Sequence, residues 1–171
     1  MYAAAHAAEH PDQPAVVMSP SGEVVTYRAF EERANQTAHL LRGAGLRRGD
    51  HIAVLSRNSP TMLAVEAAAE RTGLYFTLVN SYLSPDEVAY VVDNCRAGVF
   101  FAGTSVAEVA EAAARRCPKL ERRVVMPDSG LAESGGAPVP GWSRLETLVS
   151  DLPTTPIADE QLGAAMLYSS G

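Results

Sequence analysis

Residues 74–102 read LYFTLVNSYLSPDEVAYVVDNCRAGVFFA, and this stretch decides the fold class. Its first six residues are almost all apolar, which is typical of a strand covered on both faces in a parallel sheet. Ser84, Pro85 and Glu87 then stand where a helix needs an N-cap, a first-turn proline and the acidic partner of a capping box. A second apolar strand is expected over residues 99–102. The stretch therefore predicts two parallel strands joined by a helix.

The same alternation continues on both sides of this unit. A hairpin is expected over residues 15–27, leading into a helix that Thr26 caps. Further strands are expected over residues 51–56 and 124–126. Three more helices are expected to begin at the capping serines Ser59, Ser105 and Ser143. Ser105 with Glu108, and Ser143 with Glu146, have the spacing of a capping box. Strands and helices alternating at this spacing predict an α/β fold with a doubly wound, mostly parallel sheet and flanking helices.

The last third of the chain is less regular. Residues 127–141 hold four glycines and three prolines without periodicity, which predicts a long flexible surface loop with Trp142 packed at its base. After an extended linker, residues 163–168 are expected to form a final, buried apolar strand. This strand would carry the chain directly into a short polar sequence, Ser-Ser-Gly, at residues 169–171.

Composition excludes several classes of protein. The chain has 171 residues and a formal net charge of −6, and its 47% hydrophobic and 20% charged residues are typical of a globular protein. An acidic chain lacks the positive surface that nucleic acid requires. No apolar run approaches the roughly 18 residues of a membrane-spanning helix, and residues 1–11 lack the features of a secretory signal. We therefore expect a cytoplasmic protein with no transmembrane segment and no nucleic-acid partner.

The polar sequence after the last strand is the candidate functional site. A strand followed by serines and a glycine is how phosphate-binding loops begin, because glycine lets the backbone approach phosphate while hydroxyl and N–H groups donate hydrogen bonds. Ser169, Ser170 and Gly171 are therefore candidate phosphate ligands, with a plain polar tail as the alternative.

Other residues that could carry chemistry are expected to be structural. His6 and His10 lie four residues apart, but no third ligand accompanies them, so no metal site is predicted. Cys95 is expected in the core and Cys117 is expected to be inert. Three arginines after the first long helix are expected to be solvated cations that suit the helix dipole: Arg42, Arg47 and Arg48.

Several segments, taken in order, resemble the amino-terminal part of the adenylate-forming (AMP-binding) enzymes, which include acyl-CoA synthetases, luciferases and peptide-synthetase adenylation domains. Residues 25–30 (VTYRAF) are similar to that family's helix entry, and residues 40–55 (LLRGAGLRRGDHIAVL) to its Gly-Asp turn into a strand. Residues 75–90 (YFTLVNSYLSPDEVAY) look most like bacterial fatty-acyl-CoA synthetases. Residues 167–171 (LYSSG) resemble the start of the family's phosphate loop, Tyr-(Thr/Ser)-Ser-Gly-Thr-Thr-Gly-x-Pro-Lys-Gly.

This resemblance, over roughly residues 8–171, implies part of the N-terminal subdomain of the acyl-CoA synthetase-like fold. It also implies a ligase that uses ATP and Mg²⁺ to convert a carboxylic acid, most closely a fatty acid, to an acyl-adenylate and then passes the acyl group to coenzyme A. Ser169, Ser170 and Gly171 would open the loop that holds the β- and γ-phosphates. The rest of that loop, the magnesium-binding acid and the catalytic lysine lie further along in relatives, so no catalytic residue and no metal ligand is assigned here.

The same resemblance suggests that residues 1–171 are the N-terminal part of the AMP-binding large domain, without the rest of that domain or the C-terminal lid domain. Such a fragment is expected to be inactive alone, to bind none of these cofactors tightly, and to self-associate through an open strand edge or apolar face. Three alternatives stay open: a fragment of an aryl-CoA ligase, a fragment of a carrier-protein-loading adenylation domain, and a non-catalytic binding module. Peripheral membrane contact of the parent protein also stays open.

Overall fold

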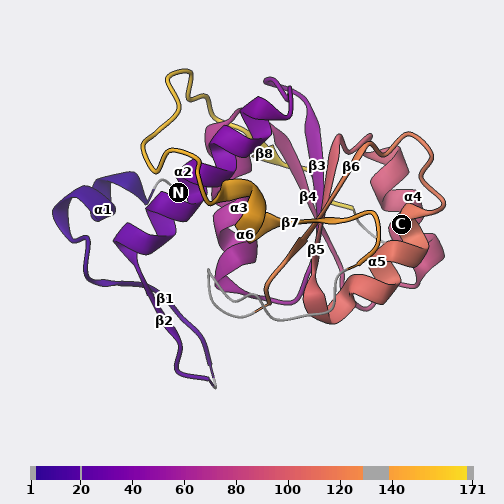
Figure 1. Ribbon diagram of the computed structural model, residues 1–171, viewed down its shortest axis with the longest axis horizontal. Coiled ribbons are helices and arrows are strands. Elements are labelled where there is room, and N and C mark those ends of the chain that lie inside the picture. Colours follow the sequence, from indigo (N-terminus) through magenta and orange to yellow (C-terminus); the bar gives the residue numbers. More distant parts are fainter. Residues whose placement is uncertain (1–2, 20, 129–138, 169–171) are drawn as a thin grey trace.

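The computed structural model describes residues 3–19, 21–128 and 139–168, and its main body is a six-stranded sheet between two layers of helices (Figure 1). The helices are α1 (Ala4–Glu9), α2 (Tyr27–Gly43), α3 (Pro60–Arg71), α4 (Pro85–Asn94), α5 (Ala107–Ala114) and α6 (Leu145–Val149), with a single-turn 3-10 helix, η1 (Thr104–Val106). The strands are β1 (Pro14–Val17), β2 (Val24–Thr26), β3 (His51–Leu55), β4 (Tyr75–Val79), β5 (Val99–Gly103), β6 (Arg122–Met126), β7 (Ser143–Arg144) and β8 (Ala164–Ala165).

The six-stranded sheet is parallel throughout and doubly wound. Its strand order is β7-β6-β5-β3-β4-β8, so the chain steps from β3 to β4, crosses back over β3 to β5, and continues outward to β6 and β7. Helices α2, α3 and α6 lie on one face and α4 and α5 on the other (Figure 1). The predicted fold class is confirmed.

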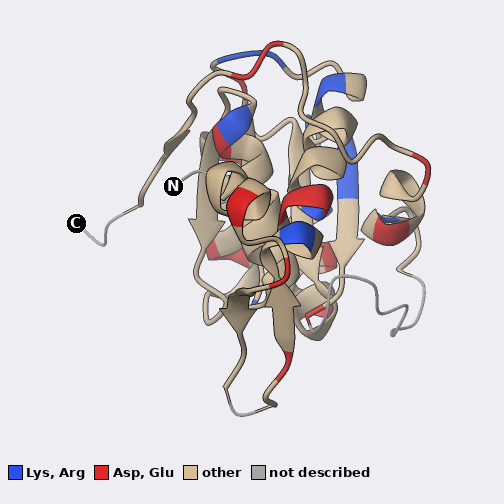
Figure 2. Ribbon diagram, turned by 90° about the vertical axis from the view of Figure 1, so that its left-hand side faces the viewer, with Lys and Arg blue, Asp and Glu red and all other residues tan. Residues whose placement is uncertain are grey.

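The antiparallel pair β1–β2 is the predicted hairpin, and it projects away from the sheet in both views (Figures 1 and 2). Positions of Lys and Arg and of Asp and Glu are interspersed along the ribbon rather than gathered by sign (Figure 2). None of the helices described here is long and apolar enough to cross a membrane.

Serine and threonine caps explain where three of the helices begin. Thr26 accepts a hydrogen bond from the backbone N–H of Ala29 (3.3 Å), and Ser59 accepts one from Met62 (3.1 Å). Ser84 forms the complete predicted capping box with Glu87. These contacts satisfy N–H groups that the first helical turn leaves without partners, which is why the sequence signals predict these starts correctly.

The two other predicted capping boxes are wrong. Ser105 lies within η1, and α5 begins two residues later with Val106 at a cap position that has no side-chain hydrogen bond. Ser143 pairs with Val124 in the short strand β7, so α6 also begins without a side-chain cap. In both places a tertiary contact takes the residue that the local pattern assigns to a helix cap.

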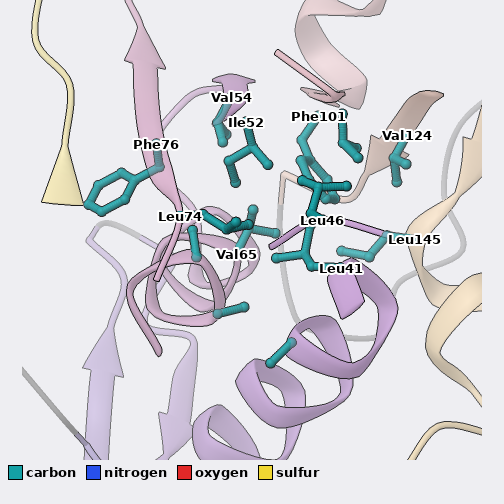
Figure 3. Packing of buried hydrophobic residues seen from close by; sticks show 14 of the residues in the cluster. Leu41, Leu46, Ile52, Val54, Val65, Leu74, Phe76, Phe101, Val124 and Leu145 are labelled. Atoms are coloured by element: carbon teal, nitrogen blue, oxygen red, sulfur yellow. The ribbon is translucent and has the colours of Figure 1, made fainter. Parts of the chain in front are cut away.

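Each face of the sheet carries its own hydrophobic core. Along β3, Ile52 and Val54 face the α2–α3–α6 layer, whereas Ala53 and Leu55 face the α4–α5 layer. Figure 3 shows the first of these cores, in which Leu41 and Leu46 meet the sheet side chains. On the second face the core includes Cys95 and Cys117, which are both 1% exposed. Burial on both faces explains why β3 and β5 read as continuous apolar runs.

The prediction that residues 74–79 are covered on both faces is only partly correct. Tyr75 and Leu78 are 43% and 40% exposed, although Phe76 and Val79 are buried. β4 is next to the two-residue edge strand β8, so fewer neighbours cover it than cover β3.

Trp142 packs as predicted at the base of the loop, of which residues 129–138 lie outside the described part of the chain. Its ring lies 5.6 Å from that of Phe100 between centroids. The indole N–H donates to Glu111 Oε2 at 2.6 Å, which satisfies the polar end of a partly buried side chain.

Candidate functional site

The predicted site residues Ser169, Ser170 and Gly171 lie outside the residues that the structure describes, which end at Tyr168. The strand before them is described. β8 pairs in parallel with β4 through Ala164 and Ala165, and the backbone N–H of Met166 donates to Phe76 at 2.9 Å. The site can therefore be built from the segment that leads into it.

This strand differs from the prediction of a buried strand over residues 163–168. Only Ala164 and Ala165 form strand pairs, both are exposed, and Leu167 is 83% exposed. The physical reason is position: β8 is the edge strand, so among the described residues only β4 pairs with it. An apolar run predicts a strand, but its burial depends on what packs against that strand.

Gly163 sets the approach of β8 to the sheet. A Cβ placed on it would overlap the backbone of Leu74 and would lie 2.8 Å from the carbonyl oxygen of Ala69. Its own N–H donates to the carbonyl of Glu70 at 2.6 Å. The chain therefore passes so close to the end of α3 that only glycine fits without a shift.

A polar face of α2 holds the connection between α6 and β8, which we call the strap (residues 150–163). Asn35 Nδ2 donates to the carbonyl of Thr154 at 2.8 Å, and Gln36 Nε2 donates to that of Leu152 at 3.3 Å. One turn further along α2, a ring nitrogen of His39 lies 2.9 Å from the carbonyl of Thr155. Side chains of one helix thus bind three carbonyls within residues 152–155 of the strap.

Arg42 extends this face, which corrects the prediction that it is a solvated helix end. Its side chain is only 14% exposed and forms an ion pair with Asp159 of the strap at 3.0 Å. It also donates to the carbonyl of Thr72 at 2.9 Å. The hydrogen bond from Arg42 holds the pKa of Asp159 below its usual value.

Arg71, the last residue of α3, is the buried centre of these contacts. Its guanidinium donates to both carboxylate oxygens of Glu31, at 2.7 and 2.8 Å, and also to Asn35 Oδ1. The backbone carbonyl of Arg71 accepts from Gln161 of the strap at 3.0 Å. The sequence prediction missed this cluster, whose one signal is the spacing of polar residues on α2: Glu31, Asn35, His39 and Arg42.

A second polar cluster lies at the carboxyl ends of β3, β5 and β6. Asp128 accepts hydrogen bonds from the hydroxyls of Ser56 (3.1 Å) and Thr104 (2.9 Å) and from the backbone N–H of Ser105. β3 and β5 flank the point where the winding of the sheet reverses, which is where open α/β sheets usually bind ligands. Here the carboxylate is occupied by donors of the chain itself, and it fills the space that Gly103 leaves free. The cluster therefore ties three strand ends together.

The part of the chain that the structure describes contains no group of three or more His, Cys, Asp or Glu residues that could hold a metal ion. His6 stacks on Tyr27, with ring centroids 5.3 Å apart. Burial raises the pKa of the Cys95 and Cys117 thiols, so neither is an activated nucleophile.

Comparison with known proteins gives the family. Residues 3–171 match the model of the AMP-binding enzyme family. The chain is 28% identical over 162 residues to the mitochondrial acyl-coenzyme A synthetase ACSM2 of Rattus norvegicus, covering 90% of this chain and 27% of that protein. It is 29% identical over 164 residues to the 3-hydroxybenzoate–CoA ligase of Aromatoleum sp. (strain CIB), covering 94% of this chain and 29% of that protein.

A solved structure supports the same assignment at the level of the fold. The anthranilate CoA ligase AuaEII, in complex with anthranoyl-AMP, superimposes on 100% of this chain and 34% of its own with a TM-score of 0.82 at 23% identity. The chain thus spans little more than a quarter of the length of the curated relatives it matches. The family match covers nearly all residues of the chain and confirms the resemblance found in the sequence. The chain belongs to the AMP-binding enzyme family.

Proposed function

We propose that the protein carrying this chain is an ATP-dependent acid–thiol ligase. A carboxylate oxygen attacks the α-phosphorus of ATP and pyrophosphate leaves; the thiol sulfur of coenzyme A then replaces AMP at the acyl carbon. The observation that carries this proposal is the family match over residues 3–171, which includes β8 and the Ser-Ser-Gly sequence after it. Within this scheme the chain is the N-terminal part of the large domain.

Ser169, Ser170 and Gly171 are the residues of this chain that we propose to contact ATP. Their hydroxyl and backbone N–H groups are donors of the kind that phosphate oxygens accept, and a glycine permits close approach of the backbone. In this proposal the described residues position the segment that leads to Ser169 and contribute no ATP ligand. They include no cluster fit to hold Mg²⁺, so we assign the metal no ligand among them.

A fatty acid is the substrate we propose, because residues 75–90 resemble bacterial fatty-acyl-CoA synthetases most closely. An aryl acid is the second candidate, favoured by the 29% identity to a 3-hydroxybenzoate–CoA ligase. We place the protein in the cytoplasm on its composition. Because the chain spans little more than a quarter of its relatives, we expect the 171 residues alone to form no adenylate.

Carboxylate-dependent exchange of pyrophosphate into ATP, measured on the full-length protein, tests the proposal. Octanoate, palmitate, benzoate and 3-hydroxybenzoate are supplied in turn, and acyl-CoA is measured after coenzyme A is added. Exchange that is fastest with the two fatty acids supports the fatty-acid assignment, and exchange that is fastest with benzoates supports the aryl assignment. A full-length protein that exchanges with no carboxylic acid contradicts the ligase proposal.

Substitutions test the site residues. Ser169→Ala combined with Ser170→Ala should lower the exchange about tenfold or more, because hydrogen bonds to charged groups contribute roughly 1.5–3 kcal/mol. Ser21→Ala is the matched control, since Ser21 is an exposed serine in the turn of the β1–β2 hairpin, whose hydroxyl accepts from the backbone N–H of Glu23 at 3.4 Å. Equal rates in the double variant and the control would remove Ser169 and Ser170 from the proposed site.

A further inference from the structure

We propose that Arg71 is a positioning residue that fixes the strap, and through it the register of β8. The last step, from the register of β8 to ATP binding, rests on the function proposed above. The juxtaposition that suggests this role is a buried guanidinium whose contacts reach both ends of one exposed connection.

Arg71 is held rigidly. Its side chain is 2% exposed, and that of its partner Glu31 is 12% exposed. Two parallel N–H···O bonds join them, and this paired geometry fixes the plane of the guanidinium. A third N–H donates to Asn35 Oδ1. The orientation of the Asn35 amide is thereby set, because its oxygen must face Arg71.

Asn35 passes this orientation to the strap. With its oxygen turned toward Arg71, its Nδ2 points to the carbonyl of Thr154 and donates at 2.8 Å. At the other end of the strap, the carbonyls of Glu70 and Arg71 accept from Gly163 and Gln161 at 2.6 and 3.0 Å. Arg71 therefore bears on both ends of the strap, through Asn35 at Thr154 and through its own backbone carbonyl at Gln161.

Polar contacts have this influence because the strap has little else to hold it. Ile157 is its one buried side chain, and most of its other residues are exposed. β8 adds two paired residues, both exposed. Segments with few buried apolar contacts open locally at low cost, so hydrogen bonds to the strap decide how long it stays docked.

Asn35→Asp separates positioning from simple stabilisation of the α2–α3 pair. The carboxylate keeps an oxygen for Arg71, but it has no N–H for Thr154 and presents a negative charge to that carbonyl. The contact between α2 and α3 is retained while the contact to the strap is lost. Glu32→Gln, an exposed substitution on the same helix, is the matched control.

Amide hydrogen exchange of the 171-residue chain, resolved residue by residue by NMR, is the first readout. In Asn35→Asp we expect the amides of Ala164 and Met166 to exchange at least about fivefold faster, the effect of losing one hydrogen bond, while amides of β3 and β5 change less than twofold. The Glu32→Gln control should leave all of them unchanged. Unchanged Ala164 and Met166, or equal acceleration throughout the sheet, would overturn the positioning role.

Exchange kinetics on the full-length protein are the second readout. Asn35→Asp, and Arg71→Lys, which keeps the charge but not the paired geometry, should each raise the KM for ATP about fivefold or more and leave the KM for the carboxylic acid unchanged. If β8 opens but the KM for ATP stays constant, the link from the strap to ATP is wrong. If the unsubstituted protein forms no adenylate, the proposed function fails, and hydrogen exchange measured on both Asn35→Asp and Arg71→Lys still decides whether Arg71 positions the strap.

Discussion

Removing Glu31 alone is expected to destabilise the fold more than removing Glu31 and Arg71 together. Glu31→Leu leaves the Arg71 guanidinium, 2% exposed, without its paired carboxylate. Breaking a buried ion pair costs about 3–5 kcal/mol, because a desolvated charge loses its partner. Arg71 keeps Asn35 and lies 3.9 Å from Glu160, so we expect the lower end, about 3 kcal/mol. For a chain of this length, that lowers Tm by roughly 6–12 °C.

The double variant Glu31→Leu with Arg71→Met removes both charges and fills their space with apolar atoms. Replacing a buried pair in this way is often neutral or stabilising, and the main expected loss is the donor to Asn35. We expect the double variant to unfold within about 2 kcal/mol of the unsubstituted chain. Urea denaturation followed by circular dichroism gives the four free energies of unfolding that a double-mutant cycle needs. A double variant as unstable as Glu31→Leu, or less stable, would refute the reasoning.

Three further outcomes are expected. Burial lowers the pKa of the His51 imidazole in the folded chain, so the unfolded chain takes up a proton there more readily. The folded state therefore has its full stability above about pH 6.5 and loses stability as the pH falls toward the lower folded-state pKa. His51→Phe, which keeps a ring beside Tyr75, should therefore flatten the fall of the urea midpoint below neutral pH, and an unchanged slope would contradict this. The exposed side of β4 should make the 171-residue chain a dimer or larger species by light scattering at high concentration, and Leu78→Lys should reduce this association; a monomer before substitution would be evidence against it. Cys95 and Cys117, both 1% exposed with pKa values raised by burial, should react with a thiol reagent only after denaturation, so rapid labelling of the native chain would count against their burial.

The elements that the sequence predicts correctly are those whose signals are local. The Ser84 capping box lies within four consecutive residues, and the apolar runs of β3 and β5 reflect burial on both faces of a parallel sheet. Ser105 fails as a cap because its N–H donates to Asp128, 23 residues away. The edge strand β8 fails as a buried strand because its exposure depends on neighbours that no local pattern reports.

The candidate site likewise has one part that local sequence predicts and one part that depends on the fold. A strand that leads into Ser169 and its neighbours is a local pattern; the structure has its paired part at Ala164 and Ala165 and describes the chain as far as Tyr168. The contact of Arg71 with Asn35 joins residues 36 positions apart and follows from the packing of α2 on α3. Sequence spacing places Asn35 and His39 on one face of α2, but only the fold brings the strap across that face.

A strand inside a parallel sheet is ordinarily held by hydrogen bonds to neighbouring strands on both sides, and this fixes where the loop after it begins. β8 has two paired residues and a single neighbour among the described strands, so the sheet supplies little of what keeps it in register. Further contacts come from the α2 side chains and the last turn of α3, and they act on the strap rather than on the strand. Substitutions on the polar face of α2 that leave the ion pair between Glu31 and Arg71 intact should therefore change ATP binding more than they change the stability of the sheet.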